Sequence, residues 1–171
     1  GVRSLVDMLR DAPIRPLFCI VGEPTGMAVA TGHKGKTALH ADCIGKEAHS
    51  ALAPTGLNAI HLAADLVTEL RNIQAKIQAN GAKDDDYDVP YSTVHVGKIN
   101  GGVVVNIVPN LCTMDFEIRN MADDDPKVIL ARIQNAARKL VEKARIHAPE
   151  ADIEITVSNT YPGLNTPTNA D

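Results

Sequence analysis

Apolar side chains recur at two different spacings along residues 36–157. Alternation at every second position is typical of a strand with one buried face. It predicts strands at residues 36–44, 91–99 and 153–157, and we expect residues 103–108 and 112–119 to continue the same sheet. A spacing of three to four positions is typical of an amphipathic helix. It predicts one helix that begins at residues 54–56 and ends near Gly81, and a second that begins at residues 123–126.

These segments follow one another in the order βαββαβ. That order predicts an α+β, ferredoxin-like fold, with a four-stranded antiparallel sheet and two helices on one face. The sequence Asn100-Gly101-Gly102 predicts a hairpin turn within the sheet. Positions on the other face carry His, Asp, Lys, Glu and Arg, so we expect that face to meet water or a cleft.

The N-terminal segment has a different pattern. Ser4 is placed to cap a short helix over residues 5–10, which Pro13 ends. Residues 17–21 form a continuous apolar run that stops at Gly22, and such a run predicts a strand buried on both faces of a parallel sheet. Because one strand cannot form a sheet, we expect this segment to belong to a larger α/β domain and the chain to be a fragment.

Charge and composition argue against two classes of partner. The chain has 17 Lys and Arg against 21 Asp and Glu, and therefore a net charge of −4. We thus expect neither nucleic acid nor an anionic membrane as a partner. The three cysteines, Cys19, Cys43 and Cys112, lie among apolar neighbours without a CxxC spacing. We expect them to be buried free thiols in a reducing cytoplasm.

Two residues are candidates for chemistry because of where they lie. Glu23 follows the predicted buried strand, and α/β sheets place ligands at the carboxyl ends of strands. Its carboxylate could bind a metal, or it could be a solvated loop acid. His49 lies in a loop before the first long helix. It could donate a hydrogen bond to a developing oxyanion, or it could be a surface or capping residue.

Two further candidates lie on or near predicted strands. Asn106 could orient a ligand carbonyl or simply close a turn. Arg119 projects from the polar face beside Asp115 and Glu117. It could form a cross-strand ion pair, or it could clamp the carboxylate of a substrate. The chain has no HExxH motif and no GxSxG motif, so we expect neither a complete zinc site nor a serine nucleophile within it.

Several sequence blocks, taken in order, resemble the zinc-dependent aminoacylase–carboxypeptidase–deacetylase superfamily. They are Gly22-Glu23-Pro24-Thr25, His33-Lys34-Gly35, the stretch from Gly45 through His49 and Pro54 to Ile60, the stretch from Gly101 through Asn106 to Pro109, and Ile118-Arg119. Together they cover nearly the whole chain, and an ordered set of blocks is far more specific than any one of them.

The resemblance implies a domain organisation. Residues 1–33 would be the C-terminal piece of the first half of an α/β catalytic domain. Residues 34–158 would be an inserted dimerisation domain, or lid, through which two subunits form a homodimer. Residues 159–171 would be the linker that returns to the catalytic domain.

The resemblance also implies roles for the candidate residues. Glu23 would be a carboxylate ligand to one of two zinc ions per subunit, with cobalt also possible. His49 would reach the partner subunit's active site and stabilise the oxyanion there. Asn106 and Arg119 would bind the carboxylate end or the amide of a small acylated amino acid. The general base and the remaining metal ligands would come from outside this chain.

We therefore expect this chain to supply the lid of a metal-dependent amide hydrolase. We expect no hydrolase activity from the chain alone. The identity of the acyl group is left open. The alternative is an independent ferredoxin-like module that binds an amino acid. The apolar run at residues 17–21 favours the hydrolase, because an independent module has no use for an unpaired buried strand.

Overall fold

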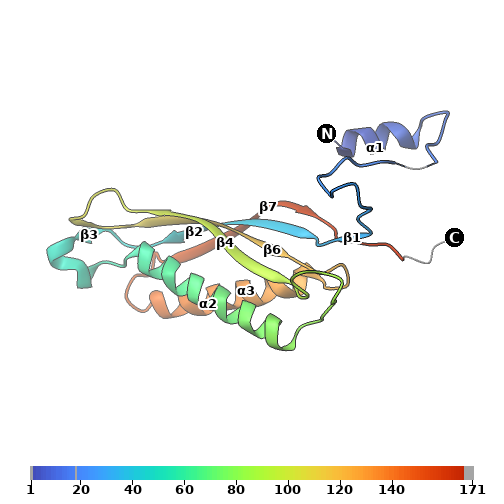
Figure 1. Ribbon diagram of the computed structural model, residues 1–171. Helices are drawn as coiled ribbons and strands as arrows, with labels where there is room; N and C mark the ends of the chain where they lie inside the picture. The colour runs from blue at the N-terminus through green and yellow to red at the C-terminus, as the bar shows by residue number, and fades with distance from the viewer. Residues whose placement is uncertain (1, 18, 168–171) are drawn as a thin grey trace. The chain divides into compact units, whose positions relative to one another are not determined.

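The computed structural model describes residues 2–17 and 19–167 (Figure 1). Its elements are α1 (Val2–Arg10), β1 (Gly32–His33), β2 (Lys36–Ile44), β3 (Ala48–His49), the 3₁₀ helix η1 (Ser50–Thr55), α2 (Ala59–Asn80), β4 (Thr93–Gly101), β5 (Ile107–Val108), β6 (Leu111–Arg119), α3 (Pro126–Ala144), β7 (Asp152–Tyr161) and β8 (Leu164–Asn165). The chain divides into two compact units, residues 1–30 and residues 31–171.

The four long strands of the second unit form one antiparallel sheet in the order β4-β6-β2-β7. The first and third of these strands in the chain therefore lie in the middle, as in ferredoxin-like folds with βαββαβ order. Both α2 and α3 lie on the same face of the sheet (Figure 1). The predicted fold class is confirmed.

The core lies between the sheet and the two helices. Every second residue of β2 and of β6 points into it, so that Leu39 lies opposite Phe116 in the register of the two strands. Burying one such large apolar side chain stabilises the fold by about 1.5–3 kcal/mol. The helices contribute Leu62, Ala63, Leu66, Leu70, Ile73 and Ile77 from α2, and Ile129, Ile133, Ala137 and Val141 from α3.

The first long helix begins later than the sequence predicted. Pro54 lies in the separate 3₁₀ helix η1, and α2 begins only at Ala59. There the side chain of Asn58 accepts hydrogen bonds from the backbone N–H groups of Ile60 and His61. An asparagine cap satisfies N–H groups that have no partner within the helix, and this cap sets the start of α2.

Residues 103–108 do not continue the main sheet, which corrects the sequence prediction. β4 runs on through Gly101, and Gly102 turns the chain with a φ of 80°. Only β5 is extended, and it pairs with β3 in a separate two-stranded sheet. Val103 and Val105 are almost completely exposed. An apolar run becomes part of a sheet only where a neighbouring strand can pair with it.

The run at residues 17–21 forms no strand in the described part of the first unit. Leu17, Ile20 and Val21 are 93%, 84% and 73% exposed, and Phe18 lies outside the described residues. A strand needs a partner for its N–H and C=O groups, and no other described residue of this unit lies in a strand. The expectation of a buried parallel strand was therefore wrong.

Two other expectations for the first unit also change. α1 includes Ser4, which lies inside the helix rather than at its cap. Cys19 is exposed, because the strand that would have buried it is not formed. Cys43 and Cys112 are buried free thiols, as predicted, and lie opposite each other on β2 and β6. Burial raises the pKa of Cys43 to about 12, so its thiol stays protonated.

The chain enters and leaves the four-stranded sheet at one place. β1 pairs with β8, so that Gly32 lies opposite Asn165. The ammonium group of Lys34 donates hydrogen bonds to the carbonyl oxygens of Val89, at 2.6 Å, and Tyr91, at 2.7 Å. These contacts fasten the loop between α2 and β4 to the incoming segment. We call this region, residues 32–36 and 161–165, the entry end of the sheet.

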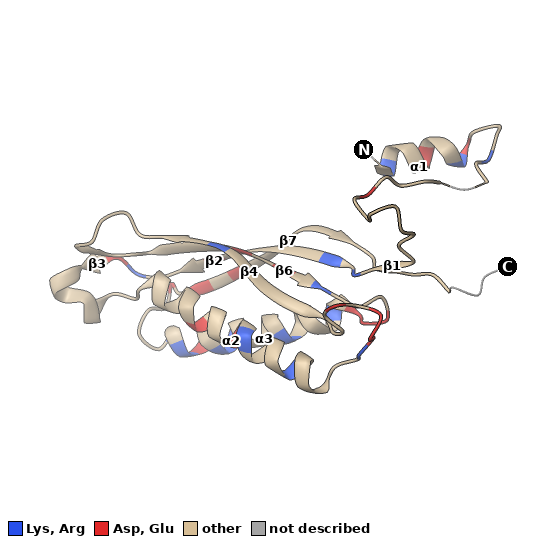
Figure 2. Cartoon of the chain, in the orientation of Figure 1, with Lys and Arg blue, Asp and Glu red and all other residues tan. Residues whose placement is uncertain are grey.

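Basic and acidic residues are interspersed along the strands of the sheet (Figure 2). In β2 and β6 they alternate with the buried positions, so they lie on the face away from the helices. Near its centre His40 lies between two carboxylates. Its Nδ1 is 2.6 Å from Oδ1 of Asp115, and its Nε2 is 3.1 Å from Oδ1 of Asp42. The hydrogen bond to Asp115, aided by Asp42, raises the pKa of His40 despite partial burial. The contact between His40 and Asp115 therefore links β2 to β6.

The buried position of Ile133 predicts a large loss of stability on truncation. Ile133→Ala should lower the free energy of unfolding by about 2–5 kcal/mol, because it leaves a cavity in a closed core. Ile146, which is 76% exposed just after α3, provides the matched control. Ile146→Ala should change stability by less than about 0.5 kcal/mol. Urea denaturation followed by circular dichroism measures both, and equal effects would contradict the assignment of the core.

The position of His40 predicts a pH-dependent contribution to stability. Because its pKa is raised in the folded protein, the stabilisation is fully present below the ordinary His pKa of about 6.5. It is lost as the pH rises through the folded-state value. The stability difference between wild type and His40→Gln should therefore be largest near about pH 5.5 and shrink toward about pH 8. His61→Gln, on the exposed side of α2, should show no comparable trend in the same urea titrations.

Candidate functional site

His49 is exposed and forms the junction between β3 and η1. It is the N-cap of η1, where its Nδ1 accepts a hydrogen bond of 3.2 Å from the backbone N–H of Ala51. An Nδ1 that accepts carries no proton, so the proton of the neutral ring lies on Nε2. His49 therefore does act as a cap, and its Nε2–H, which no described residue accepts, can donate to another group.

The structure brings Asn106 close to His49. The backbone oxygen of Asn106 accepts a hydrogen bond of 2.9 Å from the N–H of Ser50. The next residue, Ile107, pairs with His49 across the β3–β5 sheet. We call this region, residues 48–55 and 103–108, the tip. Beside it lies a surface hollow of about 470 Å³ whose lining includes Ser50, Asn58 and Ile60.

Two glycines allow the backbone to pack closely below the tip. The backbones of Lys46 and Leu57 exchange two hydrogen bonds of 2.8 and 2.9 Å. A Cβ at Gly45 would collide with the carbonyl oxygen of Leu57, and a Cβ at Gly56 would lie 2.7 Å from that of Lys46. Both glycines belong to the sequence block that contains His49. Part of that block thus builds the support for the histidine.

Arg119 is the last residue of β6, and its guanidinium is held by two neighbours. Its Nε donates to Oε1 of Glu117 at 2.8 Å, and its Nη1 donates to the hydroxyl of Tyr161 at 3.1 Å. The hydrogen bond to Glu117 raises the pKa of Arg119 against the effect of partial burial. Partial burial would raise the pKa of Glu117, but Arg119 and Lys36 outweigh it and lower that pKa. Arg119 does form an ion pair, but with Glu117 of its own strand and not across strands as expected; the cross-strand partner of Glu117 is Lys36.

The tip and Arg119 lie at opposite ends of the sheet. Arg119 ends β6, whereas Asn110, directly before β6, accepts a hydrogen bond from the N–H of Gly45 below the tip. β6, which joins these points, is nine residues long, which corresponds to about 27–30 Å along the strand. One copy of the chain therefore places His49 and Asn106 together but does not place Arg119 with them.

Glu23 lies in the first unit and is exposed. Its backbone oxygen accepts a hydrogen bond of 2.8 Å from the N–H of Thr25. Within residues 2–17 and 19–167, no cluster of three or more His, Cys, Asp or Glu side chains is arranged to hold a metal ion. Glu23 by itself supplies one carboxylate, whereas zinc sites in proteins use four ligands.

A His-x-Asp spacing, typical of some metal sites, occurs once, at His40-Ala41-Asp42. In the structure this histidine takes part in contacts within the sheet. Both ring nitrogens of His40 contact carboxylates, and the hydrogen bond to Asp115 raises the pKa of His40, which favours the protonated ring. A histidine must be neutral to bind a metal, and we therefore assign this pair to the stability of the sheet.

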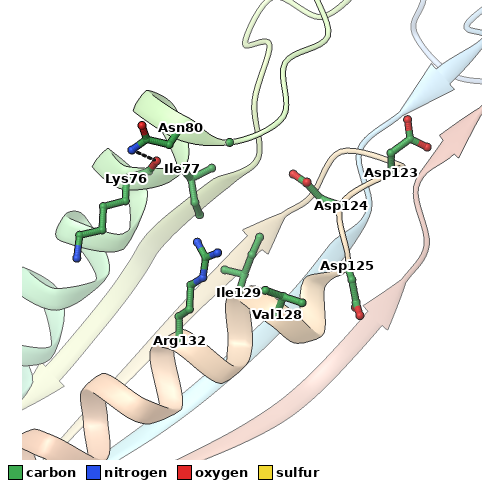
Figure 3. Close-up of a pocket in the computed structure, with 10 residues that line it drawn as sticks. Lys76, Ile77, Asn80, Asp123, Asp124, Asp125, Val128, Ile129 and Arg132 are labelled. Atoms are coloured by element: carbon green, nitrogen blue, oxygen red, sulfur yellow. Dashed lines mark hydrogen bonds between the residues drawn. The ribbon is translucent and has the colours of Figure 1, made fainter.

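A hollow of about 370 Å³ lies where the end of α2 approaches the start of α3 (Figure 3). Lys76 and Arg132 line it together with the acidic residues 123–125, which the sequence analysis had placed at the start of the second helix. Two of those acids have structural partners: Asp124 accepts a hydrogen bond from the Ser92 hydroxyl, and Asp125 caps α3.

The sequence patterns did not single out Tyr161 and Lys36 as site residues. Their closeness to Arg119 results from strand pairing.

The fold and this arrangement define a class: a ferredoxin-like α+β domain that presents polar residues at both ends of its sheet. The chain belongs to the peptidase dimerisation domain family, whose model matches residues 31–145. This membership confirms the resemblance to the aminoacylase–carboxypeptidase–deacetylase superfamily. No helix within the described residues combines the length and apolar character needed to cross a bilayer.

Curated relatives of similar sequence include two acetylornithine deacetylases. That of Aliivibrio salmonicida is 29% identical over 146 residues, which are 85% of this chain and 37% of the relative. That of Myxococcus xanthus is 29% identical over 157 residues, which are 92% of this chain and 40% of the relative. The chain thus spans about two fifths of the length of these relatives.

Solved structures share the fold. The aminopeptidase PepT of Bacillus cereus matches 82% of this chain and 33% of its own, with a TM-score of 0.58 and 22% identity. The aminobenzoyl-glutamate utilization protein of Klebsiella pneumoniae matches 82% of this chain and 34% of its own, with a TM-score of 0.61 and 19% identity. At such identities these likenesses concern the fold alone.

The hydrogen bond from Ala51 predicts the tautomer of His49. Nitrogen NMR of the imidazole above its titration range should show His49 almost wholly protonated at Nε2. His61 provides the comparison, since no described residue hydrogen-bonds its ring, and it should show a mixture of both tautomers. A His49 signal typical of an Nδ1–H ring would contradict the cap and remove the donor that the tip offers.

Proposed function

We propose that this chain is the dimerisation part of a longer metal-dependent amide hydrolase, an acetylornithine deacetylase that converts N-acetyl-L-ornithine and water to L-ornithine and acetate. The observation that supports this most is the family match at residues 31–145, joined to relatives of that name aligned over 85–92% of the chain. Residues 89–93 and 161–163 are the parts most like that enzyme. The reaction would serve arginine biosynthesis in the cytoplasm.

In this proposal His49 stabilises the oxyanion that forms when water adds to the acetyl carbonyl. Its Nε2–H is the free donor, and the N–H of Ala51 fixes the orientation of the ring. One such donor is worth about 10²–10³-fold in turnover. Asn106 lies beside it, and its side-chain amide would bind the amide of the substrate.

Arg119 binds the carboxylate of the substrate in this proposal, since a guanidinium matches a carboxylate in shape and charge. Because Arg119 lies far from the tip, a single lid cannot supply both His49 and Arg119 to one active site. In a homodimer, Arg119 serves the active site of its own subunit while His49 and Asn106 serve that of the partner. The catalytic unit is then the C2 dimer.

The metal centre is the part of the proposal that depends least on residues of this chain. Two zinc ions per subunit, or cobalt, are what the superfamily suggests, with Glu23 as one carboxylate ligand. The described residues do not by themselves fit such a centre, because no cluster of three or more ligands occurs among them. The steps assigned to this chain are therefore substrate binding, orientation and hydrogen bonding to the oxyanion.

Two alternatives remain. A related deacylase, such as succinyl-diaminopimelate desuccinylase or an aminoacylase, would use the same lid residues with a different acyl or amino-acid pocket. An independent amino-acid-binding module would need no second domain. The argument against it from residues 17–21 no longer stands, because no strand forms there, and the family match now carries the preference. Assays of the full-length protein with acetyl, succinyl and other acyl amino acids distinguish these alternatives.

Subunit complementation in the full-length protein tests the proposed division of labour. His49→Ala should lower turnover of N-acetyl-L-ornithine about 10²–10³-fold, and Arg119→Ala should raise KM about 10–100-fold. When the two variants are mixed as dimers, one site of each mixed dimer has both residues intact. A random equal mixture should therefore recover about a quarter of wild-type activity.

The control is each variant carried alone through the same dissociation and reassociation. If the mixture shows only the average of the two variants, His49 and Arg119 come from the same subunit and the proposed geometry is wrong. A His49→Ala enzyme with near-normal turnover would reduce His49 to a cap. Absence of amide hydrolysis by the wild-type enzyme on every acyl amino acid would overturn the function itself.

A further inference from the structure

The hydroxyl of Tyr161 is a hydrogen-bond donor whose proton has no acceptor in the part of the chain that the structure describes. Arg119 can only donate, so in the contact of 3.1 Å between them the tyrosine oxygen is the acceptor. The proton of the hydroxyl must then point elsewhere. No side chain or backbone group within residues 2–17 and 19–167 accepts it. Tyr161 is 41% exposed, so this donor faces the surface.

The guanidinium of Arg119 also keeps free donors. Glu117 occupies Nε, and Tyr161 occupies one position on Nη1. The N–H groups of Nη2 have no acceptor among the described residues. The donors left over, from Arg119 and from the Tyr161 hydroxyl, therefore lie next to each other on the open face of the entry end.

Strand pairing fixes this arrangement. Tyr161 on β7 pairs with Lys36 on β2, and the next residue of β2, Thr37, pairs with Ile118, the neighbour of Arg119 on β6. Three adjacent strands thus place Arg119, Lys36 and Tyr161 in a row. Because these positions lie in regular strands, the row is preorganised for a ligand.

The charges of the cluster favour a single anionic group. Lys36 lies 3.6 Å from Oε2 of Glu117, while Arg119 contacts Oε1 of the same carboxylate. Two cations around one carboxylate leave one positive charge in excess. Glu117 holds the Nε edge of the guanidinium and so keeps the remaining donors directed outward. One excess charge and two adjacent donors match the charge and the two oxygens of a carboxylate.

We propose that Tyr161 is a substrate-binding residue that shares the substrate carboxylate with Arg119, and that Glu117 and Lys36 are positioning residues for the guanidinium. This inference rests on the proposed function, because it takes the ligand to be the carboxylate of an acylated amino acid. It makes Tyr161 a specificity-determining residue: a substrate without that carboxylate gains nothing from the hydroxyl.

The test compares Tyr161→Phe with wild type in the full-length enzyme, on N-acetyl-L-ornithine and on its uncharged carboxamide. Tyr161→Phe should raise KM for the carboxylate substrate about tenfold, with kcat within about twofold. For the carboxamide the two enzymes should agree within about twofold. Tyr91→Phe is the matched control, because it removes a hydroxyl elsewhere in the lid and should alter neither substrate. An equal loss on both substrates, or no loss on either, overturns the role of Tyr161.

Glu117 is tested by the contrast between two variants. Glu117→Gln keeps an oxygen that can accept from Nε of Arg119, whereas Glu117→Ala removes it. A positioning role predicts that Glu117→Ala raises KM for the carboxylate substrate at least about threefold more than Glu117→Gln. Equal KM values for the two variants would overturn the positioning role, and unchanged melting temperatures confirm that both variants remain folded.

A direct binding measurement separates this inference from the proposed function. The Nε–H signal of Arg119 in the 171-residue chain is followed by NMR during titration with N-acetyl-L-ornithine and with the carboxamide. If the full-length protein proves not to be a hydrolase, a shift caused by the carboxylate alone, and weakened at least about threefold by Tyr161→Phe, still supports the site. In that case, the absence of any shift specific to the carboxylate overturns the site. If hydrolysis occurs but Tyr161→Phe is indifferent to the carboxylate, the inference fails and the function stands.

Discussion

The antiparallel register of β2 against β6 is the constraint on which the rest of the structure depends. In this register Leu39 lies opposite Phe116 and Cys43 opposite Cys112, so one face of both central strands is apolar and is covered by α2 and α3. A slip by one residue would exchange the two faces and bring charged side chains under the helices. Burial of the apolar face therefore specifies the register strongly, and the positions of the polar residues follow from it.

The same register arranges the open face. It brings His40 to Asp115 in the middle of the sheet, and it places Arg119 at the end where the chain enters and leaves. At the other end the backbone turns through Gly45 and the short β3–β5 sheet to expose His49. The four-stranded sheet thus carries a stabilising ion cluster at the centre of its open face and Arg119 at one end, and the tip with His49 lies beyond its other end.

This separation explains why a dimer is a chemical requirement in the proposed enzyme and more than a means of assembly. The nine-residue strand β6 separates Arg119 from the backbone below the tip, and no change of side-chain rotamer can bridge about 27–30 Å. In the proposed enzyme, a pair of lids related by twofold symmetry would give each active site one end from each subunit. Tyr161 and Glu117 would then position Arg119, and the N–H of Ala51 would orient His49.

The sequence by itself determined the main elements, because period-two and helical spacings arise directly from which side chains must be buried. It also pointed to His49, Asn106 and Arg119 as candidates, since their motifs could be read locally. It failed at residues 17–21 and 103–105, where apolar composition suggested strands but no partner strand satisfies the backbone. Only the tertiary structure decided which residues meet across strands: Tyr161 with Arg119, His40 between two carboxylates, and the tip far from Arg119. These are contacts between residues up to 75 positions apart, as for His40 and Asp115, or separated by 42, as for Arg119 and Tyr161. Pairing at such separations is set by the packing of the whole sheet, and no local pattern encodes it.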